Sequence, residues 1–481
     1  MPARVAAIGA SVHIGGDQSN ADEGTLARLV FLGMMAVLVW APLPLASNRP
    51  WAWSLLTLVV GVLLVSWAVA ALVRPHLVRF GWRKLGVPAL LFLGAFVWFL
   101  LQASPILPES WQAPVWRAAG DALGRPLDGA VSVDPAASVG GALRILAYAG
   151  MFWLAAQYGR DPANAARVLW TVAIAGVAYA GYGLIVHLSG SETILWFRKD
   201  AYRGDLTSTF VNRNAYGTYA GIGLLATLAL MVRLAERGAA GRLGGRSRVI
   251  DFFDRLDPRF FLLALGWVTI ATALAFSHSR GALASTALAT ALFVGALAVG
   301  ARGRRRTVVI AGMLVLVAGL AVVELSGRGT LGRVVALAGE GTGRGPIHAL
   351  ARRAIADAPW TGHGLDSFPE VFYAYRDRTI PWESPRYDKA HSAYLELLLE
   401  AGWFAFAAVL AAAGWVVATV AAGVIRRRQR AVYPCVGLAA TALVGVQAIY
   451  DFGIQMPAIA ISYWALMGIA YAQSFRTAQP D

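Results

Sequence analysis

Apolar runs of about 20 residues recur along almost the whole sequence, and they constrain the fold more than any other feature. The chain of 481 residues is 58% hydrophobic and only 14% charged, whereas a soluble domain carries about 25% charged residues. In lipid, a chain must satisfy its backbone hydrogen bonds internally, and apolar runs of this length do so as α-helices. The sequence therefore predicts an all-α polytopic membrane protein.

The runs define about twelve transmembrane helices. The first run follows a polar to mixed N-terminal stretch and lacks a small-residue cleavage site, so we expect it to be a retained span rather than a signal peptide. The fourth run is among the shortest. The expected spans are residues 26–47, 52–73, 86–103, 141–158, 168–188, 213–233, 260–277, 282–300, 307–325, 392–424, 432–450 and 455–473.

Lysine and arginine gather in every second connection between the spans. If the N-terminus lies in the cytoplasm, the clusters at residues 74–84, 233–259, 302–306 and 426–430 all stay inside, and the short opposite connections are poor in basic residues. Cytoplasmic loops typically hold this excess. The net charge of +15 has the same source, so we expect membrane lipids and no nucleic acid as partners.

This topology divides the chain into five parts. We expect a cytoplasmic N-terminal tail (1–25), spans one to nine (26–325), a large periplasmic loop (326–390), spans ten to twelve (391–473) and a cytoplasmic tail (474–481). Two further outer segments cover residues 104–140 and 189–212.

The large loop contains an amphipathic pattern. Ile347, Leu350, Ala351 and Ala354 recur at helical spacing, and Pro359 ends the predicted helix. Aromatic residues follow. We expect the loop to lie on the membrane surface as a lid or substrate platform. A solvated cap with interfacial aromatic residues is the alternative.

Two candidate segments carry an arginine at the outer end of a span. In STFVNRN (208–214), Asn212 is suited to cap the sixth span. Arg213 then falls in the first turn of that helix. An arginine and a helix N-terminus together favour the binding of phosphate. The alternative is that Arg213 only reaches lipid headgroups. In the turn SHSRG (277–281), Arg280 is the basic residue and Gly281 permits close backbone approach. His278 is either functional or only a hydrogen-bonded turn residue.

The third candidate segment, KAHSAYL (389–395), opens the tenth span after the large loop. His391 is suited to general acid–base chemistry near neutral pH. Glu396 and Glu400 lie one turn apart on the same helix and either orient a partner or pair locally. Asp451, in the last outer turn, is a candidate partner for one of the arginines.

Several kinds of site are missing from the sequence. The single cysteine, Cys435, excludes a disulfide framework. The sequence has no Asp-x-Asp pair that would hold a divalent metal, and no P-loop or Rossmann fingerprint. We therefore expect neither a metal nor a cofactor, and neither ATP nor a nucleotide sugar as the direct substrate.

Four segments together resemble the O-antigen ligase and polymerase superfamily. They are STFVNRNAYGTYAGIGLL (208–225), SRGALAS (279–285), APWTGHGLDSF (358–368) and AHSAYLELLLEAGWF (390–404). Their order, the span count and the large outer loop before the last three spans also agree with that superfamily, so the resemblance covers most of the chain. It implies a GT-C-like fold in the bacterial inner membrane, with the active site facing the periplasm.

The resemblance also implies a metal-independent, inverting glycosyltransferase that takes a glycan from undecaprenyl diphosphate. The acceptor is lipid A–core in the ligases of lipopolysaccharide biosynthesis, and another lipid-linked repeat unit in the polysaccharide polymerases. Arg213 and Arg280 match the family's arginine pair for the diphosphate, and His391 matches the base for the acceptor hydroxyl. The further substrate-binding residues expected are Asn212, Asn214, Gly362, Gly364, Phe368 and Lys389.

One departure and two competing classes remain open. The family commonly has His-Asn where this chain has His391-Ser392, which puts acceptor specificity in question. A lipid-linked glycan transporter also has about twelve spans, but proteins of that class typically have internal repeats and charges near the bilayer midplane. A non-enzymatic scaffold for polysaccharide export is the other class. Ligase and polymerase are not separated by the sequence.

Overall fold

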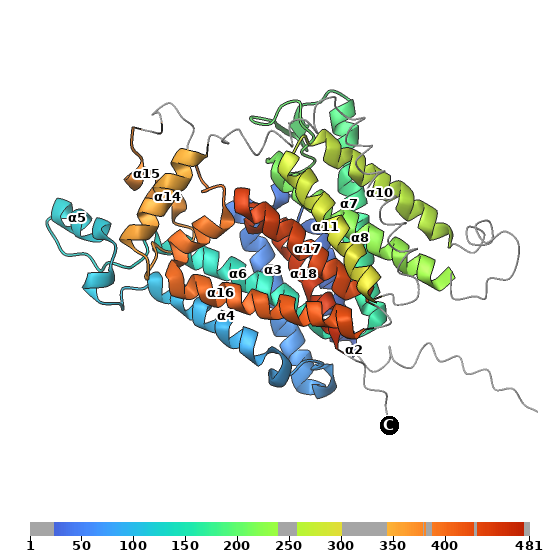
Figure 1. The fold of residues 1–481 in the computed structure, drawn as a ribbon. Coiled ribbons are helices and arrows are strands. Elements are labelled where there is room, and N and C mark those ends of the chain that lie inside the picture. Colours follow the sequence, from blue (N-terminus) through green and yellow to red (C-terminus); the bar gives the residue numbers. More distant parts are fainter. Residues whose placement is uncertain are drawn as a thin grey trace, which may run out of the picture.

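The computed structural model describes residues 24–238, 257–300, 344–378, 380, 387–427 and 431–475. Helices build almost all of this part of the chain (Figure 1). Its only strands are β1 (Thr193–Ile194) and β2 (Phe197–Arg198), which pair as a short antiparallel hairpin. The predicted all-α polytopic fold is confirmed.

Nine helices in the described ranges are long and apolar enough to cross a membrane. The shorter α2 (Gly24–Trp40) and α18 (Pro457–Ser474) correspond to the first and twelfth expected spans, and the ninth, 307–325, lies outside the described residues. The nine are α3 (Pro50–Val73), α4 (Trp82–Gln102), α6 (Pro135–Tyr158), α7 (Pro162–Leu188), α8 (Arg213–Gly238), α10 (Pro258–Phe276), α11 (Arg280–Gly300), α16 (Ala393–Arg426) and α17 (Val432–Tyr450).

Shorter helices lie in the connections. They are α5 (Pro114–Leu123), α14 (Gly345–Asp357), α15 (Phe368–Tyr375) and the 3-10 turns η1 (Leu45–Ser47), η2 (Pro75–Leu77), η3 (Glu109–Trp111) and η4 (Gly453–Gln455).

An aspartate cap followed by proline starts three of the long helices. The side chains of Asp134, Asp161 and Asp257 accept backbone N–H groups at the starts of α6, α7 and α10. Proline suits the first helical position because its missing N–H would have no partner there. The fourth span is therefore longer than expected: α6 begins at Pro135, whereas the apolar run begins near residue 141.

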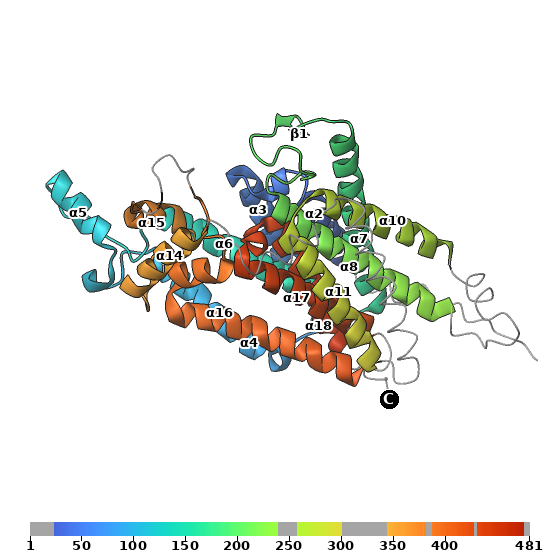
Figure 2. The same cartoon turned by 45° about the horizontal axis from the view of Figure 1, so that its top comes forward.

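The core lies along α18 and α8. Almost every residue of α18 is buried, where the helix packs against α6, α17 and α16. On the other side, α8 packs against α7, α10, α17 and α11. Figures 1 and 2 show α17 and α18 in the middle of the molecule, with α4 and α16 along one edge.

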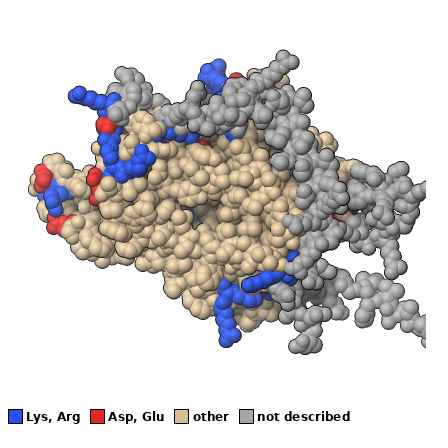
Figure 3. Space-filling view, in the orientation of Figure 1, with Lys and Arg blue, Asp and Glu red and all other residues tan. Residues whose placement is uncertain are grey.

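The outer surface is apolar between two charged ends. Leucine and valine side chains of α3, such as Leu58, Val65 and Leu72, point away from the protein. Figure 3 shows a broad band without charged residues, with lysine and arginine gathered above and below it. An exposed apolar band of this kind is what lipid contact requires.

The amphipathic helix predicted in the large loop is α14, and it ends at Asp357, before Pro359 as expected. Its environment differs from the expectation. Ile347, Leu350 and Ala354 are buried against α15 and α16, in a cluster with Phe368, Phe372 and Leu399. Protein, rather than the membrane surface, therefore covers its apolar face.

The tenth expected span is broken near its start. Gly402 has φ 71° and ψ 169°, far from helical values. The loop backbone is hydrogen-bonded to α16 at this break. The N–H of Trp403 in α16 donates to the carbonyl of Pro359 in the loop at 2.9 Å. The N–H of Gly364 in the loop donates to the carbonyl of Glu400 in α16 at 3.0 Å. The break thus provides backbone partners that anchor the large loop.

Candidate functional site

The N-terminus of α8 is capped as the sequence predicts. The side-chain oxygen of Asn212 accepts the backbone N–H of Asn214 at 2.7 Å and that of Ala215 at 3.3 Å. Because the cap fixes the first turn, Arg213 and Asn214 project in defined directions from this helix end.

Arg213 is held by an aspartate from the preceding outer segment. Its Nη1 lies 2.8 Å from Oδ2 of Asp205, whose side chain is 13% exposed. The guanidinium lies 5.6 Å from the ring of Tyr202. The Arg213 side chain is 37% exposed, and its Nε has no hydrogen-bond partner. One nitrogen thus anchors the guanidinium.

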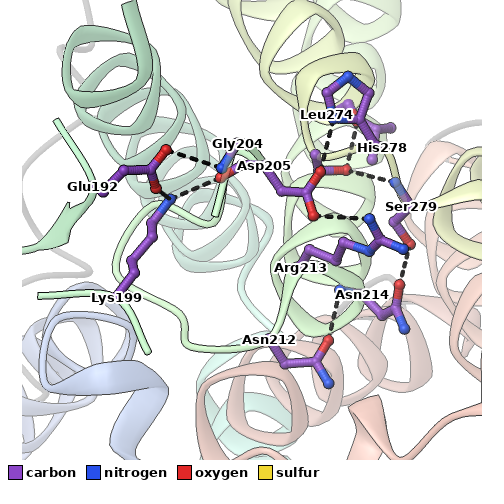
Figure 4. A network of polar contacts seen from close by, with 11 residues as sticks. Glu192, Lys199, Gly204, Asp205, Asn212, Arg213, Asn214, Leu274, His278 and Ser279 are labelled. Carbon is purple, nitrogen blue, oxygen red and sulfur yellow. Dashed lines mark hydrogen bonds and ion pairs between the residues drawn. The ribbon is translucent and has the colours of Figure 1, made fainter. Parts of the chain in front are cut away.

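The turn between α10 and α11 lies beside this helix end. Nδ1 of His278 lies 2.8 Å from Oδ1 of Asp205, so one carboxylate contacts two elements (Figure 4). Ser279 donates through its hydroxyl to Oδ1 of Asn214 at 2.8 Å. Arg280, half-buried, follows directly as the first residue of α11. The two predicted arginines therefore stand at the N-termini of adjacent helices.

Asn214 connects α8 to the last outer turn. Its Nδ2 donates to Oδ2 of Asp451 at 2.5 Å, and the other carboxylate oxygen accepts the N–H of Phe452 at 2.8 Å. The Asp451 side chain is buried. The carbonyl of Asp451 accepts the N–H of Ala393, at the start of α16, at 3.3 Å.

His391 completes this group. Its Nδ1 lies 3.9 Å from Oδ1 of Asp451, is buried and has no hydrogen-bond partner. The imidazole packs between the rings of Phe452 and Tyr387, with centroid separations of 5.3 and 6.1 Å, and is 19% exposed. We call the following residues the polar cluster: Asp205, Arg213, Asn214, His278, Ser279, Arg280, His391 and Asp451.

The structure brings together residues that the sequence analysis treated separately. Asp451, which the sequence makes a candidate partner for an arginine, contacts Asn214 and lies near His391 in the structure. Asp205 was missed. It lies in the segment 189–212, which has no helical periodicity, and its contacts lie 8 and 73 residues away in sequence.

Lys389, predicted to bind substrate, lies between two carboxylates. Its Nζ is 2.9 Å from Oε1 of Glu396 and 3.6 Å from Oδ1 of Asp366. Glu396 is fully buried and also accepts the N–H of Ala390 at 2.7 Å. Asp366 in turn pairs with Arg144 of α6. Glu396 therefore fixes the two residues that precede His391. A substrate contact of Lys389 stays a prediction.

The other loop residues predicted to bind substrate make close internal contacts. Gly362 and Gly364 have φ of 67° and 99°. A Cβ on Gly362 would overlap Glu400, and a Cβ on Gly364 would overlap Ser132. Phe368 is buried, and its N–H donates to Oε1 of Glu400 at 3.2 Å. Packing alone accounts for these residue types, and their contact with substrate stays a prediction.

Burial changes the titration of one group beside the polar cluster and of one in the large loop. It raises the pKa of Tyr202, and the charges of Asp451 and Asp205 act in the same direction, so this phenol stays protonated at neutral pH. Burial lowers the pKa of His363 in the large loop, where Nε2 lies 2.8 Å from the carbonyl of Ala354.

The described ranges offer a groove and no metal site. No group of three or more His, Cys, Asp or Glu side chains there could hold a metal ion. A groove of about 770 Å³ lies between α7 and α10 and is lined by Arg167, Trp170, Arg259 and Leu262 among others. These residues lie near the N-termini of α7 and α10, whereas the polar cluster lies at the C-terminal end of α10.

Comparison with known families agrees with this geometry. Residues 265–410 match the family model described as O-Antigen ligase. The matched range runs from α10 into α16 and includes His278, Arg280, the large loop and His391. No curated protein matches the chain. Residues 265–410 are thus similar to the O-antigen ligase family, and they lie in a chain with several helices long and apolar enough to cross a membrane.

Proposed function

We propose that this protein is a glycosyltransferase of the bacterial inner membrane that moves a glycan from undecaprenyl diphosphate to lipid A–core. One observation carries the proposal: Arg213 and Arg280 begin two helices that the Ser279–Asn214 hydrogen bond joins, and Asn214 connects them through Asp451 to His391. Cations and helix N-termini suit a diphosphate, and a histidine suits a hydroxyl acceptor.

The diphosphate is the leaving group. As the bond between the anomeric carbon and the phosphate oxygen breaks, its electron pair goes to that oxygen, and negative charge grows on the diphosphate. Arg213 and Arg280 stabilise this charge, because guanidinium groups match phosphate oxygens in geometry. The two helix N-termini add partial positive charge.

The acceptor hydroxyl is the nucleophile. His391 takes its proton as the oxygen forms a bond to the anomeric carbon. The carboxylate of Asp451, 3.9 Å from Nδ1, stabilises the imidazolium that results. Attack from the face opposite the diphosphate inverts the anomeric centre. The arginines and the histidine supply charge stabilisation and proton transfer without a metal ion.

The distribution of Lys and Arg supports a periplasmic site. The polar cluster lies at the N-terminal ends of α8 and α16, whereas in the sequence the basic segments 233–259 and 426–430 begin at the C-terminal ends of these helices, and such segments favour the cytoplasm. Labelling of single cysteines tests this orientation in a Cys435→Ser background. Residues 109 and 192 should react from outside, and residue 83 should not.

A turnover assay tests the activity. Purified protein is incubated with a lipid-linked glycan and lipid A–core, and the glycolipid product and free undecaprenyl diphosphate are measured. The proposal expects both products in equal amounts. Movement of intact lipid-linked glycan across a vesicle membrane, without turnover, would indicate a transporter instead.

A deletion strain tests the acceptor. Loss of a ligase leaves polymeric glycan on the lipid carrier, whereas loss of a polymerase leaves single repeat units. We expect lipid-linked polymer and unmodified lipid A–core. Accumulation of single units would assign the enzyme to the polymerases of the same superfamily.

A further inference from the structure

Asp205 contacts two side chains, and only one of them has a role in the proposed reaction. Its Oδ2 lies 2.8 Å from Nη1 of Arg213, and its Oδ1 lies 2.8 Å from Nδ1 of His278 (Figure 4). His278 lies two residues before Arg280. The carboxylate therefore connects the imidazole to both arginine-bearing helix ends.

The segment that carries Asp205 is braced from behind. The buried amino group of Lys199 donates to the carbonyl of Asp205 at 2.7 Å and lies 3.7 Å from Oε2 of Glu192. The other oxygen of Glu192 accepts the N–H of Gly204 at 2.9 Å. Figure 4 shows these contacts on the side of Asp205 away from Arg213. A carboxylate held in this way has a fixed position.

Asp205 in turn fixes the orientation of His278. The carboxylate engages Nδ1, so Nε2 is the ring nitrogen left to meet a ligand, and the side chain is 46% exposed. The backbone of His278 has φ 50°, a left-handed conformation that is strained for a non-glycine residue. A strained, partly exposed histidine beside two arginines is typical of a binding site.

The charges around Asp205 favour an anionic ligand at Nε2 of His278. Asp205 neutralises part of the charge of Arg213, whereas a diphosphate brings at least two negative charges. A protonated imidazole donates from both ring nitrogens. One N–H then meets Asp205, and the other is available to a phosphate oxygen as a charge-assisted hydrogen bond.

We propose that His278 binds the diphosphate of the lipid-linked donor through Nε2, as a third donor beside Arg213 and Arg280, and that Asp205 is its positioning residue. This inference rests on the proposed function. It assigns a role to His278 of the SHSRG turn and to Asp205, which lies outside the range that matches the family model.

Equilibrium binding to the purified full-length protein in nanodiscs tests the role of His278. The probes are undecaprenyl diphosphate and undecaprenyl monophosphate. We expect His278→Ala to weaken diphosphate binding on the order of 10-fold and monophosphate binding by less. The matched control is His76→Ala, which removes an exposed histidine in η2, away from the cluster. If His278→Ala reduces thermal stability, His278→Gln replaces it.

Asp205→Asn tests the positioning role. We expect weaker diphosphate binding, and the Asp205→Asn/His278→Ala double variant should lose less than the product of the two single losses, because Asp205 acts partly through His278. If Asp205 only braces the fold, the binding loss of the double variant should equal the product of the two single losses, and Asp205→Asn should weaken the binding of both lipids equally. That result would overturn the positioning role.

Two outcomes contradict the inference itself. Unchanged diphosphate binding in His278→Ala would remove the third donor, and tighter binding in Asp205→Asn would make the carboxylate a competitor of the phosphate. Wild-type protein that binds neither lipid would instead contradict the proposed function.

Discussion

The side-chain amide of Asn214 donates a 2.5 Å hydrogen bond to the carboxylate of Asp451, across 237 residues of sequence. Its neighbour Arg213 binds a different aspartate, Asp205. Each aspartate faces a histidine, His391 in one case and His278 in the other. The first turn of α8 therefore organises both histidines of the polar cluster.

Asp451→Asn should impair catalysis more than binding. An amide cannot stabilise the imidazolium of His391 as a carboxylate does, so we expect kcat to fall by at least about 10-fold with little change in KM for the donor. Steady-state turnover of lipid-linked glycan measures this. Asp121→Asn, on the exposed surface of α5, is the matched control. Wild-type kcat in Asp451→Asn would show that this carboxylate does not assist the base.

Glu396→Ala should destabilise the protein. The change leaves Lys389 without its closest carboxylate and the N–H of Ala390 without its acceptor. Asp366 remains beside Lys389, so the main cost is the unsatisfied buried N–H and the weakened pairing, about 1–3 kcal/mol, which thermal denaturation in detergent would show as a lower Tm. The double variant Lys389→Met/Glu396→Leu should recover part of the loss. No recovery would mean that the N–H contact dominates.

Gly402→Ala should disrupt the joint between the large loop and α16. The glycine has φ 71°, and a Cβ would overlap the backbone of Trp360 and Gly362. Strain and overlap together should cost on the order of 2–5 kcal/mol. Gly124 also has positive φ, 64°, but has open space around it, so Gly124→Ala should cost only about 1–2 kcal/mol. Equal Tm shifts in the two variants would rule out the close contact as the cause.

The large loop should lose stability at acid pH. Burial lowers the pKa of His363, so the unfolded chain binds a proton more readily than the folded one. The stability that depends on neutral His363 is fully present above its pKa in the unfolded chain, about 6.5, and declines as the pH falls towards its lower pKa in the folded protein. Melting curves between pH 8 and pH 5 should show a smaller loss for His363→Gln than for wild type. His76→Gln controls for a generic histidine effect, and identical slopes in all three proteins would contradict the assignment.

The sequence predicted the elements better than their contacts. The apolar runs, the Asn212 cap and the helix before Pro359 depend on local chemistry, which residue types and spacing reveal. The break at Gly402 was not predicted, because the apolar pattern continues through it and only the loop backbone that docks there requires it.

The candidate site shows the same division. Arg213, Arg280 and His391 could be chosen because they lie at span ends and match a family pattern. Asp205 could not, since a lone aspartate in an aperiodic segment has no local signal. The partners of Glu396 and Glu400 likewise depend on how the large loop folds back onto α16.

The most direct test of the proposed diphosphate site is single-turnover glycan transfer by purified wild type, Arg213→Ala and Arg280→Ala, with exposed Arg83→Ala as the control. Loss of one charge-stabilising donor should slow transfer by on the order of 10²-fold or more in each cluster variant, while Arg83→Ala keeps the wild-type rate and all four proteins share one Tm. Full transfer by a folded Arg213→Ala or Arg280→Ala variant would contradict the proposal that this arginine pair binds the diphosphate.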